Sequence, residues 1–348
     1  MRYESAEYHV NFVYNWNRMA SKSFLVTKNL PEKFFKNIST KLKMDMWQHS
    51  HEMTRQQLLE RVAGKSGILC TLSDKIDRQL LDAAGPQLKC ISTLSVGYDH
   101  IDLDECKRRG IVVGNTPDVL TDAVAELTIA LLLATIRRLF EANQALRQGK
   151  WLGGWGHFFM CGSMVKGSHI GMIGGTGRIG RSIIHRLRSF EPSKISYTAR
   201  TAQPSMEQEF NASFVTLDKL LAESDIIIVC CSLNDSTRRL LGAEQFRRMK
   251  STAVLINTSR GACIDQQALY EALKNGIIAA AGLDVMETEP IPTDDPLLTL
   301  NNAGKFNILF TFRHHTKCLY LSVKFYVHLG GIIPYVKSYY QIDNSFIL

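Results

Sequence analysis

A glycine-rich turn has the residue types and spacing that bind a pyrophosphate. Gly175, Gly177 and Gly180 form a GxGxxG pattern between an apolar strand and an amphipathic helix. Glycines let the backbone turn tightly and approach a phosphate, whose charge then lies at the amide end of the helix. The pattern predicts a dinucleotide site, and a glycine-rich turn without a ligand is the alternative.

The end of the next strand bears on which dinucleotide binds. NAD sites usually carry Asp or Glu about 20 residues beyond the glycines, where the acid binds the ribose 2′-hydroxyl. Here the strand ends in the segment Tyr197–Thr201, which contains Arg200 and Thr201. Between Tyr197 and Glu207 the sequence has no Asp or Glu. A cation and a hydroxyl suit a 2′-phosphate, so the corner favours NADP(H) over NAD(H). The alternative is that Arg200 is a solvated loop charge.

Short apolar runs alternate with amphipathic helical patterns, which is typical of parallel sheets with crossover helices. We therefore expect an α/β fold with two doubly wound parallel-sheet domains. The expected strands are Ser23–Thr27, Gly67–Thr71, Lys89–Leu94 and Ile111–Gly114, then Ser168–Gly174, Lys194–Ala199, Asp225–Cys231, Ala253–Asn257 and Ala279–Asp284.

Helices are expected between these strands. They are Glu32–Leu42, Thr54–Val62, Lys75–Ala84, Asp102–Arg109, Ala123–Leu139, Gly177–Phe190, Leu217–Glu223, Ala243–Met249 and Gln266–Asn275. Asp122 is placed to cap the long helix from Ala123. The resulting division is an extension over 1–21, domains over 22–117 and 118–304, and an atypical tail over 305–348. That tail has ten Phe or Tyr residues and no Glu after residue 305.

Composition excludes several classes of protein. With 348 residues, 45% of them hydrophobic, the chain is neither disordered nor fibrous, and no apolar run reaches the roughly 20 residues of a membrane span. The formal charge is +8, but the basic residues are spread out, which argues against a nucleic-acid partner. No CxxC pair or secretion signal is present, so we expect reduced thiols, no metal site and a cytoplasmic protein.

Four further motifs resemble the D-2-hydroxyacid dehydrogenase family, and within it the glyoxylate reductase/hydroxypyruvate reductase group. They are Leu94–His100 (LSVGYDH), Gly114–Asp122 (GNTPDVLTD), Ile256–Gly261 (INTSRG), and Ala281–Val285 (AGLDV) followed by Glu289-Pro290. The similarity spans about residues 22 to 302. It implies a flavodoxin-like substrate domain, a Rossmann cofactor domain and a homodimer. It also implies NADPH-dependent reduction of glyoxylate and hydroxypyruvate to glycolate and D-glycerate.

The resemblance also assigns roles to single residues. The backbone amides of Val96 and Gly97 and the guanidinium of Arg260 would hold the substrate carboxylate, and Glu289 would orient and charge a catalytic histidine. The positions implied to meet the cofactor are Gly175, Gly177, Arg178, Ile179, Gly180, Arg200, Thr201, Ser232, Thr258 and Asp284. Structural alternatives exist, because Ser232 could simply end a strand and Asp284 could cap a turn.

The chain departs from the family pattern at three places. Both Gly174 and Gly175 are present, so the first glycine of the turn is ambiguous, and the pair Trp151 and Trp155 is spaced one residue wider than usual. Relatives continue into a Pro-His-Ile-Gly-Ser segment whose histidine protonates the substrate oxygen, and no such segment occurs here. His314 and His315 follow a possible strand but lack the flanking residues of that segment. We interpret them as solvated, and replacement of the family's histidine by either one is the alternative.

Three functions follow as alternatives. The first is the NADPH-dependent reductase of small 2-oxo acids, for which we expect slow turnover because the family's histidine is missing. The second is an NAD-linked dehydrogenase of another 2-hydroxy acid, against which the missing acid near Arg200 argues. The third is a nucleotide-sensing binding protein without turnover.

Overall fold

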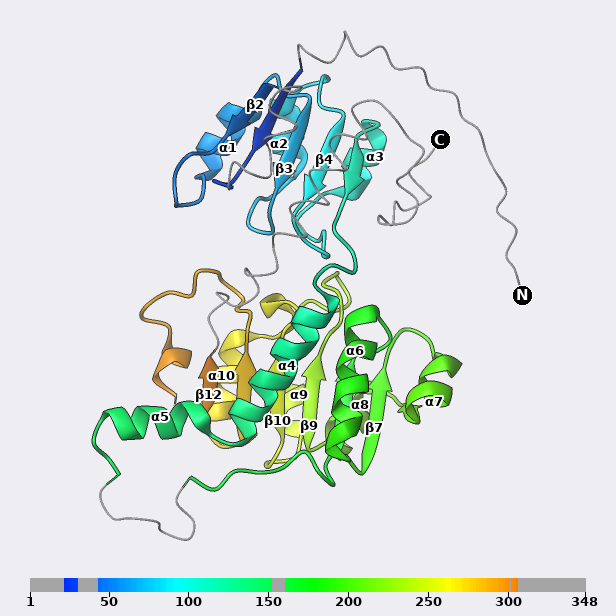
Figure 1. The fold of residues 1–348 in the computed structure, drawn as a ribbon, viewed down its shortest axis with the longest axis vertical. Helices are drawn as coiled ribbons and strands as arrows, with labels where there is room; N and C mark the ends of the chain where they lie inside the picture. Colours follow the sequence, from blue (N-terminus) through cyan, green and yellow to red (C-terminus); the bar gives the residue numbers. More distant parts are fainter. Residues whose placement is uncertain (1–21, 31–42, 152–159, 301, 306–348) are drawn as a thin grey trace. The chain divides into compact units, whose positions relative to one another are not determined.

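The computed structural model describes residues 22–30, 43–151, 160–300 and 302–305. They form two compact units with a boundary between Val119 and Leu120 (Figure 1). Every strand pair in the described part of the chain is parallel, and helices follow most of the strands. The expected α/β class with two doubly wound parallel sheets is therefore confirmed. The helix expected over residues 32–42 lies outside the described residues.

The first unit is built on a five-stranded sheet. Its elements are β1 (Ser23–Val26), β2 (Lys43–Met46), α1 (Arg55–Val62), β3 (Gly67–Cys70), α2 (Arg78–Ala84), β4 (Cys90–Thr93), α3 (Leu103–Arg108) and β5 (Val112–Gly114). The strand order β2-β1-β3-β4-β5 is that of flavodoxin-like sheets. In such sheets ligands bind beyond the carboxyl ends of the strands.

The second unit is built on a seven-stranded sheet. Its strands are β6 (His169–Ile173), β7 (Lys194–Thr198), β8 (Ala212–Phe214), β9 (Ile226–Val229), β10 (Val254–Asn257), β11 (Ala280–Leu283) and β12 (Ala303–Lys305). Its α-helices are α4 (Thr121–Ile136), α5 (Leu139–Arg147), α6 (Arg178–Leu187), α7 (Pro204–Phe210), α8 (Leu217–Glu223), α9 (Ala243–Arg248) and α10 (Gln266–Lys274). The order β12-β11-β10-β9-β6-β7-β8 is the Rossmann order with a seventh strand added beside β11.

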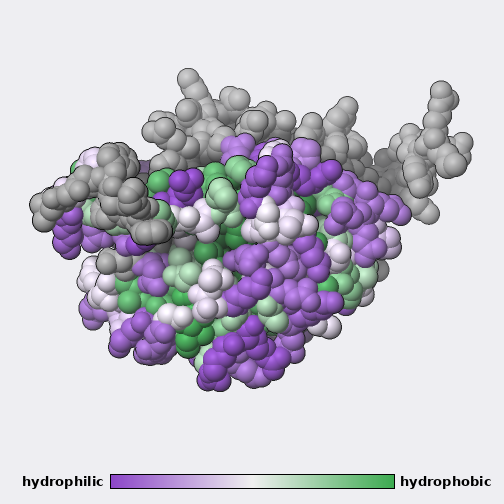
Figure 2. Space-filling model, turned by 90° about the horizontal axis from the view of Figure 1, so that it is seen from below, coloured by the Kyte–Doolittle hydropathy of each residue, from purple (hydrophilic) through white to green (hydrophobic). Residues whose placement is uncertain are grey.

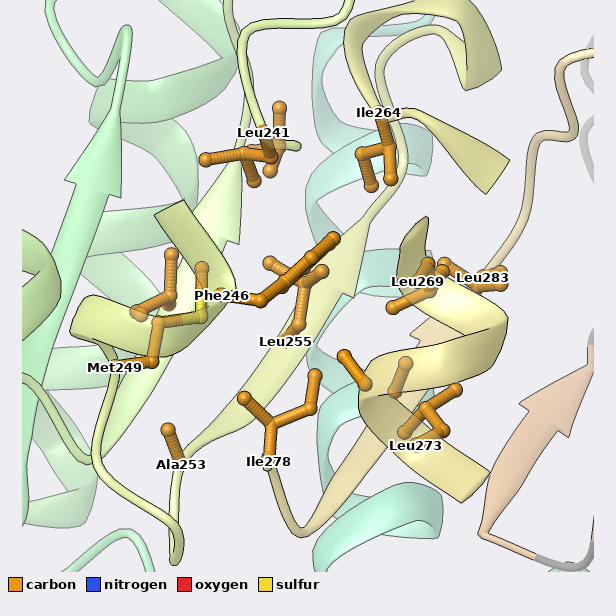
Figure 3. Close-up of a cluster of buried hydrophobic side chains, with 14 of the residues drawn as sticks. Leu241, Phe246, Met249, Ala253, Leu255, Ile264, Leu269, Leu273, Ile278 and Leu283 are labelled. Atoms are coloured by element: carbon orange, nitrogen blue, oxygen red, sulfur yellow. The ribbon is translucent and has the colours of Figure 1, made fainter. Parts of the chain in front are cut away.

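Strand β9 shows why this sheet is buried on both faces. Its four residues are apolar and buried, and alternate side chains point to opposite faces. Ile227 and Val229 join a core with α8, α9 and α10, whereas Ile226 and Ile228 join a second core with α4, α6 and α7. Figure 3 shows the first core, where Phe246 lies fully buried beside β10.

The start of α4 differs from the prediction. The helix begins at Thr121, its N-cap is Leu120, and no side chain caps it, so the capping role expected for Asp122 is wrong. Asp122 lies in the first turn, and its carboxylate instead accepts hydrogen bonds from Ser182 (3.0 Å) and Arg186 (3.0 Å) of α6. A cation and a hydroxyl on the neighbouring helix thus compete successfully with the helix's own amides.

The other end of α4 also differs, because the helix stops at Ile136. Arg138 has φ +54°, which breaks the helix, and α5 then begins at Leu139. Leu139 and Leu146 of α5, together with Trp151, are large hydrophobic residues that remain about half exposed. The face in Figure 2 is mainly hydrophilic with smaller hydrophobic areas. Over the described ranges, no helix has the length and apolar character that crossing a bilayer requires.

Candidate active site

The glycine turn between β6 and α6 is shaped by close backbone contacts. Gly174 has φ +82°, and a Cβ added there would lie 2.5 Å from Cα of Cys231. A Cβ on Gly180 would lie 2.4 Å from the carbonyl oxygen of Gly175. Gly174 therefore makes the turn, and Gly175 with Gly180 lets helix α6 approach the strand. The two candidates for the first glycine of the motif, Gly174 and Gly175, thus have different structural roles.

The first turn of α6 can receive an anion. Gly177 is the N-cap, is exposed, and would leave an added Cβ with no heavy atom within 4 Å. The first intrahelical hydrogen bond runs from the Arg181 amide to the Gly177 carbonyl (2.9 Å), so the amides of Arg178, Ile179 and Gly180 precede the helix ladder. This open turn fits the pyrophosphate of a dinucleotide.

The corner after β7 carries the exposed side chains of Arg200 and Thr201. The chain returns to the strand two residues later, where the Gln203 amide donates to the hydroxyl of buried Tyr197 (2.8 Å). Because β7 pairs with β6, this corner lies at the same sheet edge as the glycine turn. A ligand bound at the glycine turn after β6 would therefore have the cation of Arg200 nearby, at the end of the neighbouring strand β7.

The loop after β10 is held by Asn257, a fully buried residue at the end of the strand. Its side-chain amide donates to the Arg260 carbonyl (3.0 Å), and its oxygen accepts from the amide (3.0 Å) and hydroxyl (2.9 Å) of Ser259. The guanidinium of Arg260 is further oriented by a bond to the Ser259 carbonyl (2.8 Å). Thr258 in the same loop lies 2.8 Å from the hydroxyl of Thr128 in α4.

Gly261 brings the loops after β10 and β11 into contact. A Cβ there would lie 1.9 Å from the carbonyl carbon of Met286, a distance that no side chain allows. On the second loop, Glu289 accepts a hydrogen bond from the Met286 amide (2.8 Å). The loop that carries Arg260 and the loop that carries Glu289 therefore touch through their backbones.

The loop after β4 in the first unit presents consecutive peptide amides. The Ser95 carbonyl accepts from the Thr116 amide (2.9 Å), and the Val96 carbonyl accepts from the Asn115 side chain (2.8 Å). In a trans peptide the N–H points opposite to the carbonyl. Anchoring these two carbonyls therefore directs the amides of Val96 and Gly97 away from Asn115 and Thr116, which suits an anionic ligand on the open side.

Comparison with known proteins decides the family. A family model described as D-isomer specific 2-hydroxyacid dehydrogenase, NAD binding domain, matches residues 129–305, which is more than half of the chain. The chain belongs to this family. The dehydrogenase is 47% identical to human glyoxylate reductase/hydroxypyruvate reductase over 274 residues, which cover 79% of this chain and 83% of the human protein. The suspected resemblance is confirmed.

Other relatives place the dehydrogenase among enzymes with either cofactor. It is 43% identical to a glyoxylate reductase of Korarchaeum cryptofilum over 80% of this chain and 83% of that protein. The NADPH-dependent glyoxylate/hydroxypyruvate reductase of Sinorhizobium meliloti, solved with NADP and malonate, has TM-score 0.74 and 30% identity and covers 88% and 93% of the two chains. D-lactate dehydrogenase of Aquifex aeolicus, solved with NAD and lactic acid, has TM-score 0.79 and 25% identity over 92% and 99%.

The dehydrogenase carries the expected cofactor positions at one edge of its larger sheet. The glycine turn follows β6, the Arg200 corner β7, Ser232 β9, Thr258 β10 and Asp284 β11, and the strands are all parallel. Ser232 is exposed, and its carbonyl accepts the hydroxyl of Thr237 (2.7 Å). The sequence interpretation missed Asn257 and Asn115, two amides that hold the loops; an Asn at a strand end before a turn was the available signal.

Asp284 of the dehydrogenase is a buried acid in an unfavourable place. Burial, followed by the negative charge of Glu289, raises its pKa from 3.8 to about 6. Between these values the folded state binds a proton that the unfolded state does not, so stability falls as pH rises from about 4 to 6 and stays lower above. A carboxylate held ionised at this cost is typical of a functional site.

Replacing Asp284 with Asn is expected to stabilise the protein while weakening cofactor binding. The neutral amide removes the buried charge, so the gain in the free energy of unfolding should be roughly 2 to 3 kcal/mol at pH 8 and much smaller at pH 4. Thermal unfolding at both pH values measures the gain, and calorimetry with NADPH measures affinity. Asp235→Asn, at an exposed position, is the control; equal effects of the two variants at pH 8 would contradict the prediction.

Proposed function

We propose that this dehydrogenase reduces glyoxylate and hydroxypyruvate to glycolate and D-glycerate with NADPH. The observation that carries the proposal is the contact of Gly261 with Met286, which joins the Arg260 loop to the Glu289 loop at the sheet edge that bears the glycine turn. A fixed guanidinium suits a small substrate with a carboxylate, because its planar fork binds both oxygens. The activity named for the human and archaeal relatives supports the same substrate class.

The chain's own residues have distinct parts in this reaction. The amides of Val96 and Gly97 and the guanidinium of Arg260 hold the substrate carboxylate, which orients the 2-oxo group. The open first turn of α6 holds the pyrophosphate, and Ser232, Thr258 and Asp284 follow the ends of β9, β10 and β11 at the same edge of the sheet. When bound, the nicotinamide supplies the hydride for the 2-oxo carbon.

Donation of a proton to the new hydroxyl is the step of the reaction that we expect to be slow in this protein. Glu289 has the place of the acid that orients the proton-donating histidine in the family, but the sequence after Ala303 contains no Pro-His-Ile-Gly-Ser. His314 and His315 lie outside the described residues. We therefore propose that cofactor and substrate bind normally and that turnover is slow.

The exposed hydrophobic residues of α5 fit a homodimer, which light scattering would report as twice the chain mass.

Calorimetry with the two cofactors tests the proposal. NADPH is expected to bind more tightly than NADH, and Arg200→Ala should weaken NADPH binding about 10- to 100-fold while leaving NADH unchanged, because only the 2′-phosphate meets the guanidinium. Arg247→Ala, at another exposed position of the same unit, serves as control. Tighter binding of NADH by the unmodified protein would exclude NADPH specificity and support the NAD-linked alternative.

A second candidate function follows from the missing histidine. A protein that binds NADPH and a 2-oxo acid without turning them over would act as a sensor of the nucleotide. Following NADPH absorbance with hydroxypyruvate separates the two: oxidation of NADPH supports the reductase, and binding without any oxidation supports the sensor.

A further inference from the structure

A row of buried polar side chains runs from the end of β4 to the substrate loop of the first unit. Thr93 and Ser95 are almost fully buried, at 0% and 3% exposure. The Ser95 hydroxyl lies 2.6 Å from the Gly97 carbonyl oxygen and 2.7 Å from the Thr93 hydroxyl. The Thr93 hydroxyl in turn lies 3.0 Å from Nε2 of His100. The three side chains thus form one hydrogen-bonded relay that ends on a backbone carbonyl.

The direction of every bond in this relay is fixed by donor counting. A carbonyl oxygen only accepts, so the Ser95 hydroxyl donates its one hydrogen to Gly97. Ser95 must then accept from Thr93, whose hydroxyl likewise has one hydrogen. With each contact counted as a hydrogen bond, Thr93 accepts from His100, which corresponds to the imidazole with its hydrogen on Nε2. The relay runs from His100 through Thr93 and Ser95 to Gly97.

The far end of the relay is tied to the sheet by backbone bonds. The carbonyl of His100 accepts from the Ile76 amide (2.8 Å), and the next residue, Ile101, forms a parallel bridge with Ile76. The Asp102 amide then donates to the Ile76 carbonyl (2.8 Å). The imidazole therefore stands on a backbone that is fixed to the segment after β3, and it can hold the relay in place.

We propose that His100, Thr93 and Ser95 are positioning residues for the substrate carboxylate. The Gly97 carbonyl belongs to the peptide whose N–H is that of Tyr98, so the relay sets the direction of this amide as Asn115 and Thr116 set those of Gly97 and Val96. The directions of three consecutive amides are then fixed. In this proposal the relay side chains act through the backbone of the loop, and the inference rests on the proposed binding of a 2-oxo acid by this loop.

The size of the effect follows from the bond that is lost. A hydrogen bond to a charged group changes affinity about 10- to 100-fold, and a misaligned amide forfeits much of this. Loss of one relay hydroxyl is therefore expected to weaken carboxylate binding about tenfold. The cofactor contacts belong to the second unit, so NADPH affinity should stay unchanged.

A matched pair of serine variants tests the relay in the full-length protein. Ser95→Ala removes a relay hydroxyl, whereas Ser92→Ala removes a hydroxyl on β4 that is equally buried, at 1% exposure, and has no hydrogen-bond partner among the described residues. With NADPH present, calorimetry should show oxalate binding about tenfold weaker in Ser95→Ala and unchanged in Ser92→Ala. With NADPH and oxalate bound, hydrogen exchange of the Tyr98 amide should accelerate in Ser95→Ala alone.

A second pair excludes a general loss of structure. Thr93→Val keeps the shape of the side chain but breaks the relay, and Thr93→Ser keeps the hydroxyl, so oxalate binding should fall in the first and be retained in the second. Equal oxalate affinity and equal Tyr98 exchange in Thr93→Val and the unmodified protein would overturn the proposal. If the unmodified protein binds NADPH but no oxalate, the proposed function of the loop fails instead, whatever the variants show.

Discussion

Replacing residues 306–348 with the terminal segment of a relative that carries Pro-His-Ile-Gly-Ser is expected to raise the kcat for hydroxypyruvate about 10²- to 10⁴-fold. This is the usual contribution of a positioned general acid, and the new alkoxide needs a proton as the hydride reaches carbon. Glu289 is already held by the Met286 amide beside the Arg260 loop, so a histidine delivered to that place would find its orienting carboxylate.

A second graft separates proton donation from other effects of the new segment. In this version the histidine of the graft is replaced by asparagine, which keeps the packing of the segment but supplies no acid. Stopped-flow and steady-state rates with NADPH should rise in the first graft and stay low in the second, while the Kd of NADPH is the same in all three proteins. Equal rates for the unmodified protein and the first graft would contradict our account of the proton donor.

Most of the strands were predictable because they are apolar on both faces, whereas β2, β8 and β12 were not predicted. Residues 226–229 are all Ile or Val, and parallel strands covered by helices read as continuous hydrophobic runs. Strand β2 was missed because Lys43–Met46 alternates charged and flexible residues, and only pairing with β1 makes it a strand. For Asp122, local capping rules predicted a hydrogen bond to the first amides of α4. In the structure its carboxylate instead accepts hydrogen bonds from Ser182 and Arg186 of α6, and no local sequence pattern reveals this contact.

Individual site residues were predictable from the sequence, but the hydrogen bonds and backbone contacts that hold them in place were not. The segment Asn257–Gly261 indicates a binding loop from its motif, and Arg260 follows as the carboxylate ligand. That Asn257 holds both Ser259 and Arg260 depends on the folded turn, and that Gly261 rests on Met286 depends on two loops 25 residues apart in sequence. The two-glycine ambiguity likewise required the φ of Gly174 and its contact with Cys231.

Arg260→Gln is expected to lower the affinity for oxalate about 10²- to 10³-fold, because it removes two charge-assisted hydrogen bonds to one carboxylate. Arg260→Lys keeps the charge but loses the planar fork, so its affinity should lie between those of Arg260→Gln and the unmodified protein. Calorimetry with NADPH present measures both, and in the histidine-bearing graft kcat/KM for hydroxypyruvate should fall in parallel.

A variant of Asn257, whose side chain holds the Arg260 loop, provides the control for this prediction. Asn257→Ala leaves Arg260 in the chain but removes the bonds to Ser259 and to the Arg260 carbonyl, so the fork remains charged while losing its fixed direction. We expect oxalate affinity close to that of Arg260→Lys, since in both the charge persists and the bidentate geometry does not. If Arg260→Gln binds oxalate as tightly as the unmodified protein, the carboxylate lies elsewhere, and the assignment of the Arg260 loop to the substrate is wrong.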